Sequence, residues 1–218
     1  MKIQPPEPRR KPTQSRSKIL VEAIIQACQH VLENEGAEQL TTNRIAEVAG
    51  VTIGSIYQYF PNKEAILANL FSDKIAAETD QISRESTRRV LAQVKVSLRS
   101  TLREVINVNA ELHLRFLSLH GEFYRQYHGF FDFHSQVQAR NIDVYQQPSW
   151  EEWLPELLGK YQHQIVHSNL EQAAFITGNI IDRLLEAALE NKPEWLADSQ
   201  YLQQIEVAAV NFLTGQAS

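Results

Sequence analysis

Apolar residues recur along this chain at intervals of three and four positions, which is the period of an amphipathic α-helix. Alternating patterns of the kind that form β-strands do not extend over any useful length, and glycine occurs only eight times in 218 residues. The pattern therefore predicts an all-α protein. Its long helices are expected near residues 15–36, 62–83, 86–109, 111–128, 134–147, 150–167, 170–191 and 199–214.

Two short helices joined by a bend are predicted after the first long helix. The first should start at Thr42 and end at Gly50, because hydroxyl side chains cap helix starts and glycine adopts the left-handed conformation that follows a helix end. The second should start at Thr52, a further capping residue. It would pack on the first through a narrow apolar face formed by Ile56 and Phe60.

The opposite face of the second short helix is uncharged but polar and aromatic. Its residues are Gly54, Ser55, Tyr57, Gln58 and Tyr59. A recognition helix of a DNA-binding protein needs such a surface, because its side chains contact base edges in the major groove while hydroxyl groups and cations hold phosphates. The bent helix pair is therefore interpreted as a helix-turn-helix.

The run TTNRIAEVAGVTIGSIYQYFPNKEAILANLF at residues 41–71 resembles the DNA-binding domain of the TetR family of bacterial transcriptional regulators. The family pattern is T-x-x-x-I-A-x-x-A-G-V-[ST]-x-G-x-[IL]-Y-x-[HY]-F-x-x-K-E-x-L. The matching positions are Thr41 or Thr42, Ile45, Ala46, Ala49, Gly50, Val51, Thr52, Gly54, Ile56, Tyr57, Tyr59, Phe60, Lys63, Glu64 and Leu67. The resemblance covers residues 15–71, about a quarter of the chain.

The resemblance implies two groups of DNA contacts. Phosphate contacts are expected from Thr42, Thr52, Tyr57, Tyr59 and Lys63, and base contacts from Ile53, Gly54, Ser55 and Gln58.

Two alternatives stand beside these contacts. The spacing of Ile53 from Ile56 and Phe60 equally fits an orientation toward the core, whereas an outward Ile53 suits a thymine methyl group. Tyr57 and Tyr59 also fit the role of ordinary packing aromatics.

The resemblance further implies a ligand-responsive repressor that binds a palindromic operator in double-stranded DNA as a homodimer and releases it when a small-molecule effector binds. Residues 1–14 would form a basic disordered arm, 15–61 the DNA-binding domain, and 62–218 a helical domain for effector binding and dimerisation. A nonspecific architectural DNA-binding protein is the first alternative. An enzyme is less favoured, because the sequence contains no Gly-rich phosphate loop and no nucleophile elbow, and no cofactor is expected.

Charge is distributed unevenly, although the chain as a whole carries −5. The first 18 residues hold six basic side chains and one acidic one, a local net charge of +5, whereas residues 65–218 carry −6. Prolines at positions 5, 6, 8 and 12 exclude a helix there. Two interpretations of this basic segment are equally open: it follows DNA phosphates or a minor groove, or it is a solvated tail.

The single cysteine, Cys28, excludes a disulfide within the chain and lies on an apolar helix stripe, where it is expected to fill the core. No segment has the uninterrupted apolar length of a membrane span, so a cytoplasmic protein without membrane contact is expected.

Aromatic residues concentrate between residues 116 and 161, which contain 11 of the 19 in the chain. An apolar or aromatic effector would suit a pocket lined this way, although core packing produces the same pattern. The candidate effector-binding residues are Phe116, His120, Phe123, Tyr124, Tyr127, Trp150 and Trp153. Four of them are predicted to share one helical face: Phe116, His120, Phe123 and Tyr127.

His163 and His167 lie four positions apart on an expected helix, a spacing that two ligands of one metal ion can have. Glutamate does not follow the first histidine and no third ligand is obvious, so no metal site is predicted.

The last two expected helices carry broad apolar stripes that suit a four-helix interface between two copies of the chain, or equally the domain's own core. The candidate interface residues are Ala174, Gly178, Ile181, Leu185, Leu202, Ile205, Ala209 and Phe212.

Overall fold

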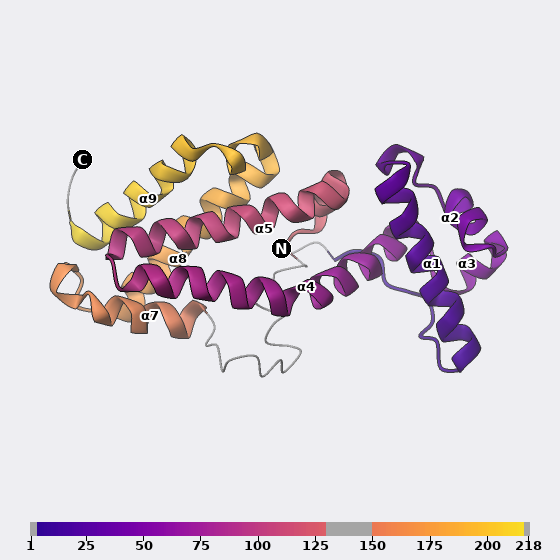
Figure 1. Ribbon diagram of the computed structural model, residues 1–218, viewed down its shortest axis with the longest axis horizontal. Helices are drawn as coiled ribbons and strands as arrows, with labels where there is room; N and C mark the ends of the chain where they lie inside the picture. The colour runs from indigo at the N-terminus through magenta and orange to yellow at the C-terminus, as the bar shows by residue number, and fades with distance from the viewer. Residues whose placement is uncertain (1–3, 130–149, 216–218) are drawn as a thin grey trace. The chain divides into compact units, whose positions relative to one another are not determined.

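The computed structural model describes residues 4–129 and 150–215, and for 74–84 and 150–152 it describes the backbone alone. All regular elements in these ranges are helical, which confirms the all-α prediction (Figure 1). The α-helices are α1 (Ser15–Asn34), α2 (Thr42–Ala49), α3 (Ile53–Tyr59), α4 (Lys63–Val94), α5 (Leu98–Tyr127), α7 (Trp150–Lys160), α8 (Leu170–Asn191) and α9 (Ser199–Thr214). Short 3-10 helices are η1 (Ala37–Gln39), η2 (Gln162–Gln164) and η3 (Pro193–Ala197).

The chain divides into two compact units. Of the described residues, 4–78 and 116–129 form the first, and 79–115 and 150–215 form the second. The helices α4 and α5 therefore each contribute one end to each unit. The division into an arm, a domain to residue 61 and a domain from residue 62 stays a prediction.

The first unit is built around α1, which packs against α2. Ile24, Cys28 and Val31 on α1 are fully buried. Cys28 thus fills the core as predicted, and burial raises the pKa of its thiol to about 12. A thiol with so high a pKa stays protonated and is a poor nucleophile.

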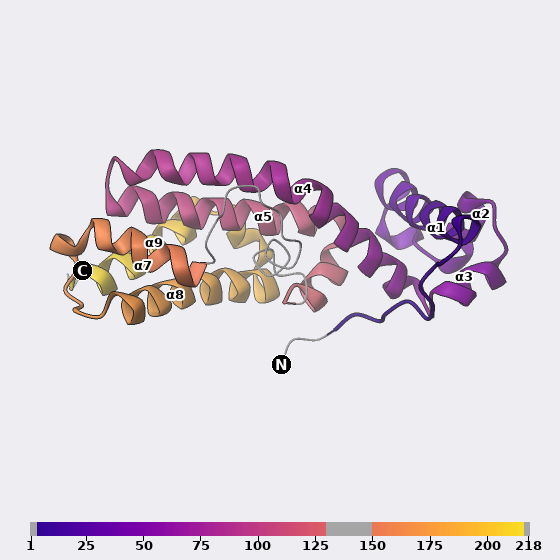
Figure 2. The ribbon, with the colours of Figure 1, turned by 90° about the horizontal axis from the view of Figure 1, so that it is seen from below.

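The second unit is built around α8, which packs against both α7 and α9 (Figure 2). An ion pair ties α5 to α9: Arg103 Nε donates to Glu206 Oε2 at 2.6 Å, and Glu206 is 1% exposed. The Tyr161 hydroxyl, after α7, donates to the Val94 carbonyl at 2.5 Å and so fastens α7 to the end of α4.

Several predicted helix boundaries are wrong. The helix that starts after Asn62 continues to Val94 rather than ending near residue 83, and no break occurs at residues 109–111. The interruption falls at Ser97 instead, whose Oγ accepts from the Ser100 N–H at 3.0 Å and restarts the helix. Residues 161–167 lie beyond the end of α7, while 170–191 and 199–214 are confirmed. The helix predicted at 134–147 lies outside the described residues.

Candidate nucleic-acid interface

The bend between α2 and α3 is fixed by backbone geometry at Gly50. This residue has φ 66° and ψ 31°, the left-handed conformation predicted for it. Its N–H donates to the Glu47 carbonyl at 3.1 Å, and the Val51 N–H donates to the Ala46 carbonyl at 3.0 Å. These bonds satisfy carbonyls that the end of α2 would otherwise leave unpaired. The chain therefore leaves α2 in one defined direction.

Both short helices start at threonine caps. Thr52 Oγ1 accepts from the Ser55 N–H at 3.2 Å, as predicted for α3. At α2 the cap is Thr41, whose Oγ1 accepts from the Arg44 N–H at 3.1 Å, so the prediction of Thr42 as the cap is wrong by one residue. Thr42 is the first residue of α2 and is half-buried.

The apolar face of this pair is narrow and fully enclosed, as the sequence predicts. Ile45 on α2, Ile56 on α3 and Phe60 after α3 are each at most 1% exposed. These contacts hold α3 against α2 and leave the other side of α3 open to solvent.

The open side of α3 contains Ile53, Gly54, Tyr57 and Gln58, all exposed, with Ser55 half-buried. Ile53 is 36% exposed and Tyr57 43%, which decides between the two orientations of Ile53 in favour of the outward one. A Cβ added to Gly54 would meet only Thr52 Oγ1, at 3.8 Å. Nothing inside the described part of the chain therefore requires a glycine at this position.

The prediction that Tyr59 lies on the outer face of α3 is wrong. Its side chain is 8% exposed and belongs to the core of the first unit. Tyr59 follows Ile56 by three positions, and residues so spaced share a helical face.

Lys63 is the first residue of α4 and is half-buried. Its Nζ donates to the carbonyl oxygen of Leu40 at 3.2 Å, so the ammonium group links the start of α4 to the loop before α2. Asn62 caps α4 as predicted, since its Oδ1 accepts from the Ala65 N–H at 3.0 Å.

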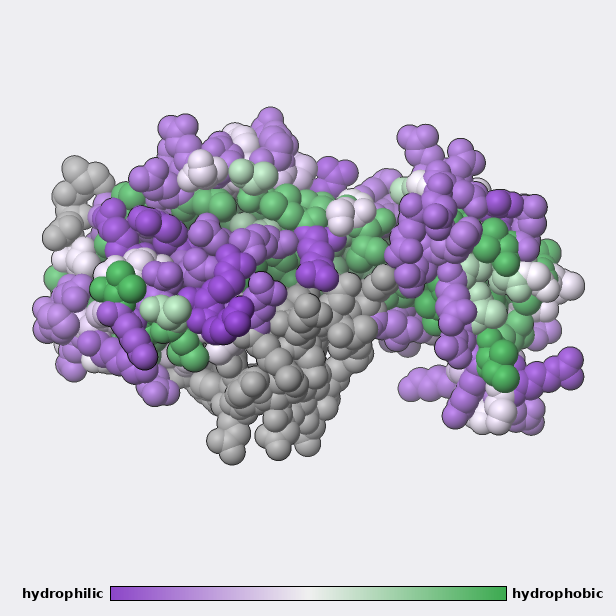
Figure 3. All heavy atoms as spheres, viewed as in Figure 1, coloured by the Kyte–Doolittle hydropathy of each residue, from purple (hydrophilic) through white to green (hydrophobic). Residues whose placement is uncertain are grey.

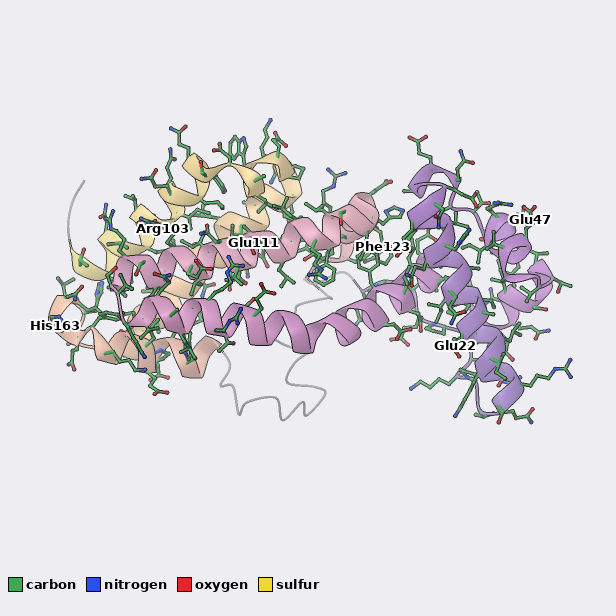
Figure 4. The ribbon with its side chains drawn as sticks, in the orientation of Figure 1. Glu22, Glu47, Arg103, Glu111, Phe123 and His163 are labelled. Carbon is green, nitrogen blue, oxygen red and sulfur yellow. The ribbon has the colours of Figure 1, made fainter. Side chains whose placement is uncertain are left out.

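The ion pairs of Arg44 are not predicted by the sequence pattern. Its guanidinium donates two bonds to the Glu35 carboxylate, both at 2.8 Å, and lies 2.7 Å from Glu47 Oε2. The hydrogen bond from Arg44 lowers the pKa of Glu35. Arg44 and Glu47 stand three positions apart on α2, and this spacing is the one signal of the ion pair in the sequence. Figure 4 labels Glu47 on this helix. The cation of Arg44 is thus held within the protein.

Four of the predicted effector-binding residues are buried aromatics that pack together with Phe71 of α4, which was not among the predicted residues. The four are Phe116, Phe123, Tyr124 and Tyr127. Ring centroids lie 5.1 Å apart for Phe71 and Phe123, 5.4 Å for Phe116 and Tyr124, and 4.8 Å for Phe123 and Tyr127. Figure 4 labels Phe123 among these side chains. We call these five residues the aromatic cluster. This close packing fits the alternative in which the aromatic residues form part of the hydrophobic core. Their role in effector binding stays a prediction.

His120 interrupts α5 with φ −162° and ψ 90°. Its Nδ1 accepts from the Phe123 N–H at 3.1 Å, so the side chain caps the last turns of the helix. The prediction that Phe116, His120, Phe123 and Tyr127 share one helical face is therefore wrong, because helical spacing does not continue across the kink. Partial burial lowers the pKa of His120, and Lys63 lowers it further.

Trp150 and Trp153 belong to α7 in the second unit. Trp153 is half-buried, and the Trp150 side chain lies outside the described part. Their part in effector binding stays a prediction.

Most of the predicted dimer-interface residues are in the core of the second unit, which corrects their assignment to a surface. Those at most 3% exposed are Ala174, Ile181, Leu185, Ile205 and Ala209. Gly178, Leu202 and Phe212 are half-buried. The exposed large apolar residues of α8 are instead Phe175, Ile176 and Leu184, at 66%, 42% and 37%.

His163 and His167 do not share a helix, contrary to the prediction. His163 belongs to η2, and His167 stacks on Phe212 and bonds the Phe212 carbonyl through Nε2 at 2.6 Å. In the ranges that the structure describes, no three His, Cys, Asp or Glu side chains gather as metal ligands do.

No helix in the described part of the chain is both long and apolar enough to span a membrane.

Comparison with known proteins gives one family match and several relatives. The model of the bacterial regulatory proteins of the tetR family matches residues 24–70, which include α2 and α3. The fatty acid metabolism regulator protein of Bacillus subtilis (strain 168) is 36% identical over 75 residues, 34% of this chain and 39% of that protein. The nucleoid occlusion factor SlmA of Vibrio vulnificus is 31% identical over 84 residues, 37% of this chain and 43% of that protein. The match thus spans about two fifths of the length of these relatives.

One solved structure extends the similarity in fold over most of the chain. RolR, solved with the ligand resorcinol, covers 91% of this chain and 89% of its own length, with a TM-score of 0.50 and 16% sequence identity. At this identity the similarity concerns the fold alone.

Proposed function

Because the chain belongs to the TetR family of bacterial regulatory proteins, a family of transcriptional regulators, we propose that it acts as a ligand-responsive repressor. In this proposal a homodimer binds a palindromic operator and a small, largely apolar or aromatic effector releases it. The observation that carries the proposal is that one face of α3 is exposed and uncharged while the opposite face is buried in the core of the first unit.

The residues on that face suit contacts with base edges. Gln58 pairs well with adenine, and Ile53 with a thymine methyl group. At Gly54 the absence of a side chain leaves room for the duplex, since the protein itself does not fill the space. Ser55 would contribute a short hydroxyl beside Gln58.

Phosphate contacts would surround these base contacts and fix the register of α3. The hydroxyl groups of Thr42, Thr52 and Tyr57 and the ammonium group of Lys63 are the proposed donors. Lys63 has three donor hydrogens, and one suffices for the Leu40 carbonyl, so the others remain for phosphate.

Dimerisation is proposed through the outer face of α8, where Phe175, Ile176 and Leu184 are exposed. Exposed aromatic and aliphatic side chains on one helix are typical of an interaction site. A dimer doubles the number of base pairs contacted, and its two-fold axis matches a palindrome whose half-sites lie about 34 Å apart.

Effector release is proposed to act through the aromatic cluster. Phe71 belongs to α4, whose first residue follows α3 closely, and it packs on Phe123 of α5. An apolar guest that separates these rings would displace the start of α4 and with it α3. The effector needs to favour the released conformation by about 1–3 kcal/mol.

The test is selection of duplexes bound by the full-length protein from a random pool, at one fixed salt concentration, because salt alone changes affinity by orders of magnitude. Repeated enrichment of one short palindrome is expected. Binding without enrichment would favour the alternative, a nonspecific architectural protein.

A further inference from the structure

The N-terminal arm, which we define as residues 4–14, is attached to the end of α3. The Arg9 N–H donates to the Tyr59 carbonyl at 2.7 Å, and Arg9 Nη1 donates to the Tyr57 carbonyl at 3.4 Å. The last carbonyls of a helix have no partner within it, so the arm satisfies two groups that α3 leaves unpaired. A cation at this end of a helix is also favoured by the helix dipole.

Four exposed basic residues follow this attachment along the chain. Arg10 and Lys11 follow Arg9 directly, and Arg16 and Lys18 lie in the first turn of α1. Figure 3 shows hydrophilic residues gathered around this end of α1. Among the described residues, no ion pair involves any of these four cations.

The helix-turn-helix itself offers little free positive charge. The sequence of α3 contains no charged residue, and Arg44 of α2 is held by Glu35 and Glu47. Lys63 of α4 also bonds the Leu40 carbonyl, so it adds a single cation whose remaining hydrogens can reach phosphate. A protein with a net charge of −5 needs a local source of cations to bind a polyanion, and the arm and the first turn of α1 supply exposed cations in the first unit.

We propose that the arm is a second DNA-binding element, in which Arg10 and Lys11 bind backbone phosphates beside the groove that α3 enters. The hydrogen bonds of Arg9 hold these two residues next to α3. This inference rests on the proposed function of α3. In this arrangement the uncharged helix α3 contacts the bases and sets sequence preference, while the arm binds phosphates and adds electrostatic affinity.

The test measures the dissociation constant of the full-length protein for its selected operator across a series of salt concentrations. The double variant Arg10→Ala/Lys11→Ala is expected to bind more weakly and to lower the slope of log Kd against log salt by about 2, one for each lost phosphate contact. Its ranking of operator sequences should stay unchanged. The matched control, Lys160→Ala/Lys192→Ala, removes two exposed cations of the second unit and should keep the wild-type slope.

The attachment at Arg9 is tested by comparing two substitutions. Arg9→Ala removes the guanidinium but keeps the backbone N–H, whereas Arg9→Pro removes both. The proline variant should bind the operator more weakly than the alanine variant.

Two outcomes separate this inference from the function on which it rests. In the first, the wild type selects an operator and the Arg10→Ala/Lys11→Ala variant keeps the wild-type affinity and salt slope. This result would overturn the role of the arm alone. A wild-type protein that selects no sequence, with an equally unchanged double variant, would overturn both.

Discussion

A Cβ placed on Gly54 would meet Thr52 Oγ1 at 3.8 Å and no closer atom. Alanine therefore fits at Gly54 without strain, whereas Gly50 has a left-handed backbone that disfavours any side chain. Gly54→Ala should keep or raise the thermal unfolding midpoint, because alanine favours a helix over glycine by about 1 kcal/mol. It should weaken operator binding, because the methyl group would face the duplex.

Gly50→Ala provides the comparison. It should lower the free energy of unfolding by about 1 kcal/mol, since alanine is costly in the left-handed conformation. Normal operator affinity in Gly54→Ala would mean that this part of α3 does not approach DNA closely.

Tyr57 and Tyr59 should respond differently to loss of the hydroxyl group. Tyr57 is 43% exposed, so Tyr57→Phe is expected to weaken operator binding by about tenfold without changing stability, as loss of one charge-assisted hydrogen bond would do. Tyr59→Phe, at a buried ring, should keep most of the affinity. Isothermal titration of both variants against the same operator would reveal the difference, and equal losses would argue against the assigned orientation of α3.

Phe175 offers the most direct access to the proposed dimer. Phe175→Glu would place a charge in the proposed interface and should convert the protein to a monomer in analytical ultracentrifugation. Gln162→Glu adds the same charge at an exposed position outside α8 and should leave the dimer intact. A dimer that persists in Phe175→Glu would exclude this face of α8.

Ile181 tests the correction to the predicted interface. Because this side chain is fully buried within the second unit, Ile181→Ala should lower the free energy of unfolding by about 3 kcal/mol. The same loss should be measured at protein concentrations below the dimer dissociation constant.

His120 predicts a pH dependence of stability. Its Nδ1 accepts the Phe123 N–H only while the ring is neutral. Burial lowers the pKa of His120 below the ordinary value of 6.5 and Lys63 adds to this, although a backbone hydrogen bond of His120, Glu122 and Glu64 act in the opposite direction. The unfolded chain therefore binds the proton more readily, so the stability contributed by the neutral ring is complete above pH 6.5 and is lost as pH falls below it.

His120→Asn is the matching variant, because asparagine caps helices without titrating in this range. Chemical denaturation between pH 7 and pH 5 should show a smaller loss of stability in His120→Asn than in the wild type. Identical pH profiles would contradict the capping role of the neutral imidazole.

The helix-turn-helix was predictable from sequence because its signals are local. The capping threonine at position 52, the left-handed glycine at position 50 and the apolar pair Ile56 and Phe60 all lie within a few residues of the structure they determine. Tyr59 was misplaced because a tyrosine suits either side of a helix, and its side is set by its spacing from Ile56.

The second half was less predictable because its decisive contacts are distant in sequence. α8 carries large apolar residues on its exposed side as well as on its buried side, so periodicity could not decide whether Ile181 or Phe175 would face the chain's own core. The kink at His120 likewise follows from a side-chain cap that no helical pattern shows.

The central claim, that the outer face of α3 contacts bases, is tested most directly by selecting duplexes from one random pool with the wild type and with Gln58→Ala in parallel. Gln58 is exposed, so its loss should leave the palindrome and its half-site spacing intact but change or relax the preferred base at one position in each half-site. An identical consensus from the two proteins would contradict base contact at Gln58, and failure of the wild type to enrich any sequence would contradict the claim as a whole.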